Sequence, residues 1–482
     1  SLGLVGSEMC IRDRDYIKKR SLMIFNRVAE LEALKHAYNS GRAELIIVYG
    51  RRGTGKTTLI REFLREHSGV YLFTPRGDIE EILASFSDDL SYQLGEFIRF
   101  GNFKDFLEFL RFKSTKERFL IVIDEFQRLY DAYKPAMSLF QHYWDTYLRN
   151  TFIMLVLVGS AVGTIERIAL VGDAPLFGRR THELRIKDLP YIIARNYWKK
   201  YSEIEKIEIY GYFGGTPGYF TRAMDNVSPI ENVEQLVLSA GAPLAREPEE
   251  ILSEETRAPG TYMSILARIS RGKMGLPLAK IKVRKGSPTV YLRTLMIMNI
   301  VDVLRSLAQG DRIYIINDEF FRFWFRFIYP RQTFIETGRG DLIKKVILSE
   351  KDEYLSFTFE KILRELIIFS AGMKIKDTEI PYIDEMGSFW WRNIEVDACA
   401  ISKDTVIIGE AKWQDTKIDR KAVEKFLAKK EIIAKKLGKH KVVSIMLARN
   451  DFTDEARRLE NEEMILMSME ELSEHLNRLK IS

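Results

Sequence analysis

The residues from Gly50 to Thr57 read GRRGTGKT and carry the glycines, the lysine and the hydroxyl of a phosphate-binding loop. An apolar run, 45–49, precedes them and a helix-like segment, 57–66, follows, so a strand leads through a glycine-rich turn into a helix start. In such a turn the backbone N–H groups wrap a polyphosphate, and the helix N-terminus adds partial positive charge. The pattern therefore predicts binding of a nucleoside triphosphate.

Within this loop we expect Lys56 to act as a catalytic residue that reaches the β- and γ-phosphates, and the Thr57 hydroxyl to ligate Mg²⁺. The predicted cofactors are thus ATP and Mg²⁺. The residues of the motif that are predicted to contact them are Gly50, Arg51, Arg52, Gly53, Thr54, Gly55, Lys56, Thr57 and Thr58.

An acidic pair, Asp124-Glu125, ends the unbroken apolar run 119–123, which is typical of a parallel strand covered on both faces. The carboxyl end of such a strand lies at the ligand crevice of an open α/β sheet. We therefore expect Asp124 to hold Mg²⁺ through water, and Glu125 to polarise the attacking water as general base.

Two further polar positions are expected near the γ-phosphate. The apolar run 152–158 leads to Ser160, whose side chain is placed to sense that phosphate. Arg179 stands before a short strand, 182–186, where an arginine can contact the γ-phosphate within its own chain or from a neighbouring subunit of a homo-oligomer. A loop that carries two adjacent arginines is equally compatible with simple exposure to solvent.

A second set of chemically useful side chains lies near the C-terminus. Because side chains alternate along a strand, Glu410 and Lys412 of the strand 405–413 share one face, and Asp397 of the preceding strand can sit beside them. Two carboxylates and a lysine can coordinate Mg²⁺ and orient water for phosphodiester hydrolysis. The alternatives are a chance alternation of charges on a half-exposed strand, or a related fold with a silent site.

The middle of the chain is basic. From Thr256 to Ile300 there is no acidic residue, and lysines and arginines recur throughout. Three short helical patterns, 263–269, 278–281 and 287–295, precede two strand patterns, 300–304 and 312–316, and this order predicts a winged helix-turn-helix. The segregated charge favours double-stranded DNA as a partner, although winged helices also bind proteins. The residues expected nearest the DNA are Thr289, Tyr291 and Arg293.

These motifs, in order, resemble the archaeal-type ATPases of the P-loop class that are related to AAA+ and to the signalling ATPases known as STAND. The pieces that carry the resemblance are Phe25-Asn-Arg27 with Glu30-Leu31, Tyr49-Gly-Arg-Arg52, Ile123-Asp-Glu-Phe-Gln127, Gly178-Arg-Arg180 and Gly214-Gly-Thr-Pro-Gly218. The resemblance implies a helical lid after the sheet. It also implies that Pro217 of the lid packs near the adenine and that Arg27 and Glu30 brace the nucleotide from the other side.

The C-terminal pattern resembles the PD-(D/E)xK nuclease superfamily, with Glu395-Val-Asp397 in place of the usual Pro-Asp pair. The resemblance implies that Asp397 and Glu410 ligate the metal and that Lys412 positions water. It further implies that Glu360, in the helical segment 355–368, is an auxiliary acid.

We therefore predict an α/β protein with a parallel-sheet P-loop core (23–190), a helical lid (191–250), a winged helix-turn-helix (255–335) and an α/β restriction-endonuclease-like domain (340–482). Residues 1–22 are predicted to form an N-terminal arm, of which 1–14 resemble the translation of a sequencing adapter; a native arm is the alternative.

Composition agrees with this plan. A chain of 482 residues with 46% hydrophobic and 29% charged residues suits several globular domains, and the net charge of +6 is modest. No apolar run reaches the roughly 18 residues of a membrane helix, so no membrane association is expected. The two cysteines, Cys10 and Cys399, exclude a disulfide framework and favour a reducing cytoplasm.

Overall fold

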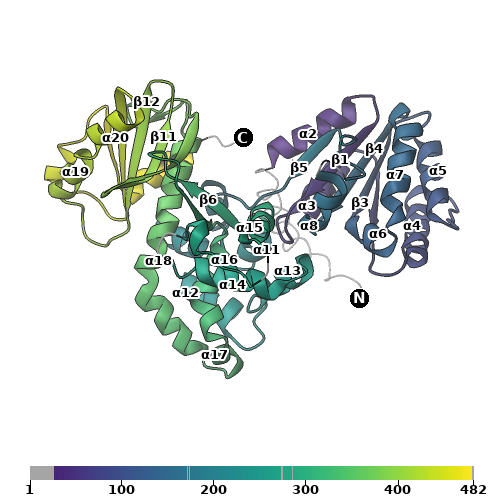
Figure 1. Ribbon diagram of the computed structural model, residues 1–482, viewed down its shortest axis with the longest axis horizontal. Helices are drawn as coiled ribbons and strands as arrows, with labels where there is room; N and C mark the ends of the chain where they lie inside the picture. The colour runs from purple at the N-terminus through teal and green to yellow at the C-terminus, as the bar shows by residue number, and fades with distance from the viewer. Residues whose placement is uncertain (1–26, 171, 173, 273–274, 285, 480–482) are drawn as a thin grey trace, which may run out of the picture.

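The computed structural model describes residues 27–170, 172, 174–272, 275–284 and 286–479, so the predicted N-terminal arm and Phe25-Asn26 lie outside the described residues, as do Lys273 and Lys285. Figure 1 shows three lobes. The N-terminal part of the chain forms one, the middle of the chain forms the second, and the C-terminal part forms the third. A single long helix, α18, runs from the middle lobe into the C-terminal lobe.

The N-terminal lobe is a five-stranded sheet in the order β2-β3-β4-β1-β5, and every neighbouring pair is parallel. Its strands are β1 (Glu44–Tyr49), β2 (Val70–Phe73), β3 (Phe119–Asp124), β4 (Ile153–Gly159) and β5 (His182–Arg185). Every residue of β1 and β4 is buried, because helices cover both faces of the sheet. The covering elements are α2 (Val28–Asn39), α3 (Lys56–Glu66), α4 (Ile79–Leu94), α5 (Phe103–Lys113), α6 (Gln127–Ala132), α7 (Pro135–Thr146), η1 (Leu148–Asn150), α8 (Val162–Ile165) and η2 (Glu166–Leu170).

The predicted lid consists of short helices, and it belongs to the middle lobe. Its elements are α9 (Tyr191–Ala194), η3 (Arg195–Tyr197), α10 (Glu203–Phe213), α11 (Pro217–Phe220), α12 (Pro229–Val233), η4 (Glu234–Leu238) and α13 (Glu247–Glu255). Helix α10 packs against both α16 and α18. The lid therefore shares its core with the segment that follows the winged helix.

The basic stretch folds as predicted in its main features. Helix α14 (Pro259–Ile269), the turn η5 (Leu278–Lys280) and α15 (Pro288–Ile297) precede the antiparallel hairpin of β6 (Val301–Arg305) and β7 (Arg312–Ile316). Ser287 caps α15 by accepting a hydrogen bond from the Thr289 N–H at 3.3 Å, and Pro288 takes the first helical position. The second predicted helix is only a single 3-10 turn.

The aromatic segment after the hairpin, residues 317–330, forms part of the core. It forms α16 (Glu319–Phe323), η6 (Trp324–Ile328), η7 (Tyr329–Arg331) and α17 (Gln332–Glu336), and Phe320 and Trp324 are fully buried. Helix α18 (Gly340–Phe369) follows and begins well before the predicted start at residue 355. Among the described residues, no helix combines the length and apolar character that crossing a bilayer requires.

The C-terminal lobe is a mixed sheet in the order β10-β11-β12-β13-β14, antiparallel from β10 to β12 and parallel from β12 to β14. Helix α18 covers one face of it, and α19 (Arg420–Leu427) and α20 (Lys430–Leu437) cover the other. These two helices are separated by Ala428 and Lys429. The remaining elements are β8 (Lys374–Ile375), β9 (Thr378–Glu379), β10 (Glu385–Trp391), β11 (Ile394–Ile401), β12 (Thr405–Lys412), β13 (Lys441–Ala448), α21 (Asp454–Arg457), β14 (Met464–Met467) and α22 (Met469–Arg478).

Candidate nucleotide site and candidate nuclease-like site

The glycine-rich loop joins β1 to α3, and its backbone carbonyls hold the side chain of its own lysine, Lys56. The Lys56 Nζ donates to the carbonyl oxygens of Gly50 and Arg51 at 2.7 and 3.1 Å, and burial lowers the pKa of this amine. Gly53 and Gly55 have φ of 83° and 95°, which a side chain would strain. The loop thus holds an ammonium group where phosphate oxygens can replace two carbonyls.

The Mg²⁺-binding candidates meet at the end of β3. The Thr57 hydroxyl donates to Asp124 Oδ2 at 3.0 Å, and the Tyr71 hydroxyl donates to the same oxygen at 2.6 Å. A hydroxyl and a carboxylate in contact are the pair that holds Mg²⁺ in P-loop proteins. Sequence reasoning missed Tyr71, although its place on β2, the strand beside β3, is a usable sign.

Glu125 combines a strained backbone conformation with a side chain that several hydrogen bonds hold in place. Its φ is 55°, in the left-handed region that costs a non-glycine residue free energy. The Ser160 hydroxyl donates to both of its carboxylate oxygens at 2.9 and 2.8 Å, and Gln127 Nε2 donates at 2.6 Å. The carboxylate is therefore preset beside the phosphate loop. Gln127 was not predicted to have a role.

The lid closes the opposite side of this pocket. Pro217 and Gly218, at the start of α11, line it together with the loop. The Gly218 N–H donates to the Gly53 carbonyl at 2.9 Å, and a Cβ atom on Gly218 would lie 2.9 Å from Gly53 Cα. From the other side Arg27 Nη2 donates to the Thr54 carbonyl at 3.2 Å. The residues of the predicted set that line the pocket are Arg52, Gly53, Gly55, Lys56, Thr57, Thr58, Glu125, Ser160 and Pro217.

The acidic cluster of the C-terminal lobe is assembled from α18, β11 and β12. Ala398 pairs with Gly409, so Asp397 and Glu410 occupy adjoining positions of the antiparallel ladder. Asp397 Oδ2 accepts a hydrogen bond from the Ala411 N–H at 2.8 Å. Burial and a neighbouring carboxylate together raise the pKa of Asp397 to about 6 and that of Glu360 to about 8.

Two lysines neutralise Glu410. Lys412 Nζ lies 2.5 Å from Oε1 and Lys429 Nζ lies 2.6 Å from Oε2. Burial acts to raise the pKa of Glu410, but the two ammonium groups hold it below its ordinary value. Lys429 was not predicted, and it stands between α19 and α20.

The side chains of this acidic cluster are only partly suited to hold a hard cation such as Mg²⁺. Carboxylate oxygens from Asp397 and Glu410 are the ligands that Mg²⁺ prefers, and crowded carboxylates gain from a cation. Within the described ranges, however, no group of three or more His, Cys, Asp or Glu side chains is arranged to hold a metal ion. A bound Mg²⁺ would have to displace the ammonium of Lys412 or Lys429 from Glu410.

Comparison with known proteins identifies the N-terminal half. Residues 24–222 match the family of ATPase domains found predominantly in Archaea. This part of the chain is an archaeal-type P-loop ATPase domain. Residues 324–425 match a family of archaeal and bacterial proteins of unknown function. The predicted resemblance and fold class are thus confirmed, while the families leave a nuclease activity untested.

Individual proteins are also similar to this chain over much of its length. An uncharacterized protein of Methanocaldococcus jannaschii is 28% identical over 404 residues, which cover 82% of this chain and 88% of the relative. A Walker-type ATPase of Pyrococcus abyssi has 20% identity and a TM-score of 0.44, covering 63% of this chain and 96% of its own. The ORC2 protein of Aeropyrum pernix has 15% identity and a TM-score of 0.36, covering 67% of this chain and 95% of its own.

The Arg51 side chain turns away from the nucleotide pocket of the ATPase domain. It is buried, forms an ion pair with Asp318, donates to Thr216 Oγ1 at 2.9 Å and lies 4.9 Å from the centroid of the Phe321 ring. Only the backbone of Arg51 belongs to the phosphate loop. Its guanidinium ties that loop to Asp318, which caps α16 beyond the winged helix.

The end of α13 also reaches the ATPase domain. Glu255 Oε2 accepts a hydrogen bond from the Val162 N–H at 2.9 Å, and burial raises the pKa of this carboxyl to about 7. Its neighbour Glu254 lies 3.6 Å from the Arg52 guanidinium of the phosphate loop. Sequence reasoning missed both contacts, because nothing local marks a helix end that docks on a distant loop.

Arg179 does not enter the nucleotide pocket of its own chain. It precedes β5, at the amino edge of the sheet, and donates to Asp145 at the end of α7 at 2.6 Å. The nucleotide site lies at the carboxyl edge, so a contact with the γ-phosphate in the same chain is not supported. The role across a subunit boundary stays a prediction.

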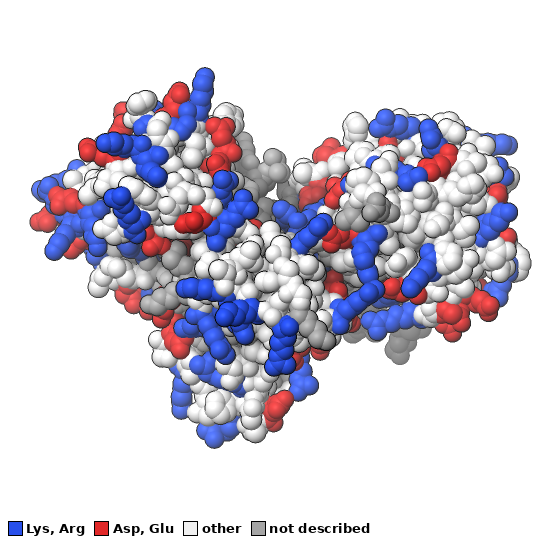
Figure 2. All heavy atoms as spheres, viewed as in Figure 1, with Lys and Arg blue, Asp and Glu red and all other residues white. Residues whose placement is uncertain are grey.

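The ATPase domain partly covers the predicted recognition helix. Arg293 Nη2 lies 2.8 Å from Glu166 Oε1 of η2, and Arg185 Nη2 donates to the carbonyls of Met296 and Ile297 at 2.7 Å. The groove between β5 and α15 is lined by Thr289, Arg293, Arg185 and Lys187, among others. Thr289 is exposed, while the Tyr291 ring packs edge-on against Tyr262 of α14 at 5.2 Å. Figure 2 shows Lys and Arg side chains gathered on the middle lobe.

Proposed function

We propose that this protein is an ATP-driven, DNA-associated machine in which the nucleotide state of the P-loop controls a basic winged helix, and in which the C-terminal domain hydrolyses DNA phosphodiesters. The observation that carries the proposal is the short segment 160–166. At its start Ser160 binds the Glu125 carboxylate, and at its end Glu166 binds Arg293 of α15. One element of seven consecutive positions therefore touches both the hydrolytic glutamate and the basic helix.

The first step is nucleotide binding and hydrolysis. Lys56 exchanges its two carbonyl acceptors for phosphate oxygens, which opens the loop around the ligand. Bound Mg²⁺, held by Thr57 and Asp124, would screen the charge that develops on the phosphates. Glu125 turns from Ser160 to a water molecule and accepts its proton. The Ser160 hydroxyl is then free to donate to the γ-phosphate.

The second step is a shift of the sensor segment. When Ser160 changes partner, α8 and η2 move with it, because they follow directly in the chain. The exposed Arg293–Glu166 pair contributes at most about 1 kcal/mol, so a small displacement is enough to break it. A duplex can then approach α15, which the ATPase domain otherwise covers through Glu166 and Arg185. This is a hinge-type closure and opening controlled by nucleotide.

The third step takes place at the C-terminal lobe. Lys412 is positioned on β12 to orient water towards a phosphodiester, and Asp397 is fixed by the Ala411 N–H. A Mg²⁺ held by Asp397 and Glu410 would polarise the phosphoryl oxygen. Burial and the neighbouring Asp397 carboxylate raise the pKa of Glu360, which favours its role as a donor of a proton or a hydrogen bond there.

Cleavage of plasmid and branched DNA tests the proposal. The wild type is compared with Asp397→Ala, each with Mg²⁺ or Mn²⁺ and with or without ATP. The matched control is Asp404→Ala, which removes an exposed carboxylate from the same β11–β12 hairpin at the end away from the cluster. We expect cutting by the wild type and the control, loss of cutting in Asp397→Ala, and faster cutting with ATP.

A second function is favoured by one observation. Both oxygens of Glu410 are occupied by lysines, which is the arrangement of a structural ion pair more than of an open metal site. In that case the C-terminal domain is a catalytically silent scaffold, and the protein is a nucleotide-gated regulator that binds DNA or a partner. ATP hydrolysis without any cutting, with DNA affinity still dependent on nucleotide, would select this function.

A further inference from the structure

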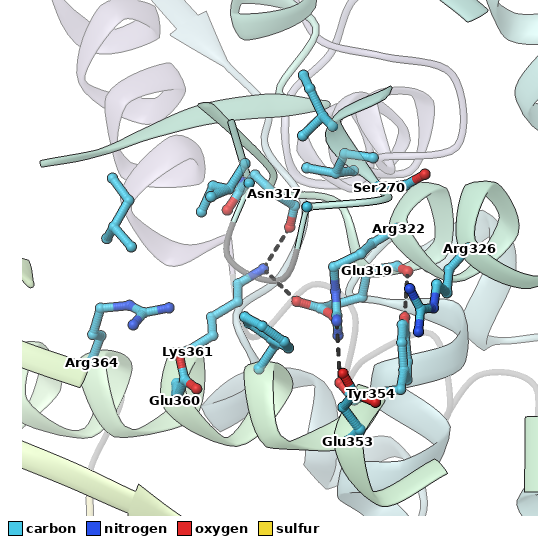
Figure 3. Close-up of a pocket in the computed structure, with 17 residues that line it drawn as sticks. Ser270, Asn317, Glu319, Arg322, Arg326, Glu353, Tyr354, Glu360, Lys361 and Arg364 are labelled. Atoms are coloured by element: carbon cyan, nitrogen blue, oxygen red, sulfur yellow. Dashed lines mark hydrogen bonds and ion pairs between the residues drawn. The ribbon is translucent and has the colours of Figure 1, made fainter. Parts of the chain in front are cut away.

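A cavity lies where the winged helix, the aromatic segment and α18 meet (Figure 3). The end of α14 and the β6–β7 hairpin form one wall, through residues such as Ile269 and Leu304. Helix α18 forms the opposite wall, and Glu360 of the nuclease-like cluster is part of it. The cavity therefore connects the basic middle of the chain with the acidic cluster of the C-terminal lobe.

Four cations line this cavity, and three of them are neutralised by carboxylates. Arg322 Nη2 lies 2.5 Å and Lys361 Nζ 3.5 Å from the carboxylate of Glu319. Arg326 pairs with Glu350 at 2.8 Å. Figure 3 shows Lys361 and Arg322 converging on Glu319, with Arg364 apart from them.

Arg364 is differently placed. Its Nη1 donates to the main-chain carbonyl of Asp397 at 2.9 Å, and within the described ranges no carboxylate lies within ion-pair distance of it. A guanidinium has five N–H donors, so most of its capacity remains for an anion. This cation stands one turn of α18 beyond Glu360 and beside the strand that carries Asp397, and its charge acts to lower the pKa of both carboxyls without a direct ion pair.

The remaining lining combines polar side chains, among them Glu353 and Glu360, with apolar surface. Phe357, on α18 one turn before Lys361, lines the cavity and is only partly buried. Tyr354 is already stacked by Arg322, whose guanidinium carbon lies 4.0 Å from the ring centroid. The same guanidinium lies farther from the Phe357 ring, at 5.9 Å from its centroid, so Phe357 is the more accessible stacking surface for an incoming planar group, with Arg364 within two turns of the same helix.

We infer that this cavity receives one unpaired nucleotide of a DNA strand, with its phosphate on Arg364 and its base against Phe357. Base stacking on aromatic rings together with arginine contacts to phosphate is how proteins hold single strands. The inference rests on the proposed function, because it supplies the strand that the acidic cluster would cut. It adds that the substrate is single-stranded where it passes between the winged helix and α18.

The test is fluorescence anisotropy of a labelled short single-stranded oligonucleotide in EDTA, which prevents cutting. Arg364→Gln removes the open cation, and Lys345→Gln removes an exposed charge from the same helix outside the cavity. Because a charge-assisted contact to phosphate is lost, we expect affinity to fall about tenfold or more in Arg364→Gln and in Phe357→Ala. Lys345→Gln should stay within about twofold of the wild type.

Equal affinity of wild type and Arg364→Gln, or an equal loss in Lys345→Gln, would overturn the inference. Binding of dAMP without any binding of the oligonucleotide would also overturn it, since the cavity would then serve free nucleotides. Duplex binding by Arg364→Gln, compared with that of Arg284→Glu, separates this inference from the proposed function. Loss of duplex affinity in Arg284→Glu, which lies just before α15, but not in Arg364→Gln would leave the winged-helix proposal intact whatever the cavity does.

Discussion

The ion pair between Arg51 and Asp318 is the tightest link between the phosphate loop and the middle lobe. The two side chains are only 1% and 2% exposed, so neither charge can be solvated if its partner is removed. Asp318 also caps α16 by accepting from the Phe321 N–H at 2.8 Å. We predict that Arg51→Met strongly destabilises the protein, although the side chain does not face the nucleotide pocket.

The expected loss of unfolding free energy follows from the low exposed fractions of the two side chains. Arg51→Met leaves the Asp318 carboxylate buried without its cation and costs about 3–5 kcal/mol, whereas in Asp318→Asn the guanidinium of Arg51 keeps Asp188 as a partner at 3.3 Å, so this variant should lose less. Asp318→Asn keeps an oxygen for the cap of α16 but removes the negative charge. The double variant Arg51→Met/Asp318→Asn contains no uncompensated charge from this pair. It should therefore lose about 2 kcal/mol less than the sum of the two single variants.

Urea unfolding followed by tryptophan fluorescence measures these differences. The control is Arg305→Met, which breaks an ion pair with Glu385 whose side chains are 50% and 43% exposed. An exposed pair of this kind contributes about 0–1 kcal/mol. The reasoning is refuted if Arg51→Met costs no more free energy of unfolding than Arg305→Met, or if the single losses add without coupling.

Three further outcomes are expected. Glu125→Gln should abolish ATP hydrolysis, measured by phosphate release, because the general base is lost. Its affinity for a fluorescent ATP analogue should stay within a few-fold of the wild type. Retained turnover would exclude Glu125 as the general base. Gly218→Ala should raise the KM for ATP, because its Cβ would meet Gly53 Cα at 2.9 Å and prevent the lid from closing; an unchanged KM would contradict the closed geometry. Burial raises the pKa of Glu365 to about 7, above its unfolded value, so the stability that this group contributes is lost as pH rises towards 7. Glu365→Gln should therefore gain up to about 3 kcal/mol relative to the wild type between pH 4.5 and pH 8, and a pH-independent difference in unfolding free energy would refute this.

The features that could be predicted from the sequence are contiguous in it. The phosphate loop requires a glycine turn and a helix start within a few residues, and Asp124-Glu125 follows its strand directly. The strand pair that carries Asp397 and Glu410 is a hairpin, so period-two alternation is enough to bring these side chains together. Local patterns of this kind also predicted the helix 287–295 and the two strands of the hairpin that follows it.

The contacts that could not be predicted join distant parts of the chain. Arg51 is separated from Asp318 by 267 positions, and its side chain was assigned to the nucleotide because its backbone is in the loop. Glu255 and Glu166 reach the nucleotide site and α15 through packing that no local pattern encodes. Arg179 was predicted to lie near the γ-phosphate from its place on the loop before the strand 182–186, whereas the edge of the sheet on which it lies depends on strand direction.

The central claim is that nucleotide state controls access to α15 through the segment 160–166. The most direct test is duplex affinity with and without a non-hydrolysable ATP analogue, which prevents turnover and leaves the contact between Ser160 and the Glu125 carboxylate in place. Glu166→Gln should raise affinity several-fold without the analogue and remove most of the dependence on it, whereas Glu117→Gln, an exposed charge at the far edge of the ATPase sheet, should do neither. If duplex affinity is the same with and without the analogue, and Glu166→Gln behaves like Glu117→Gln, the ATPase domain does not gate the winged helix.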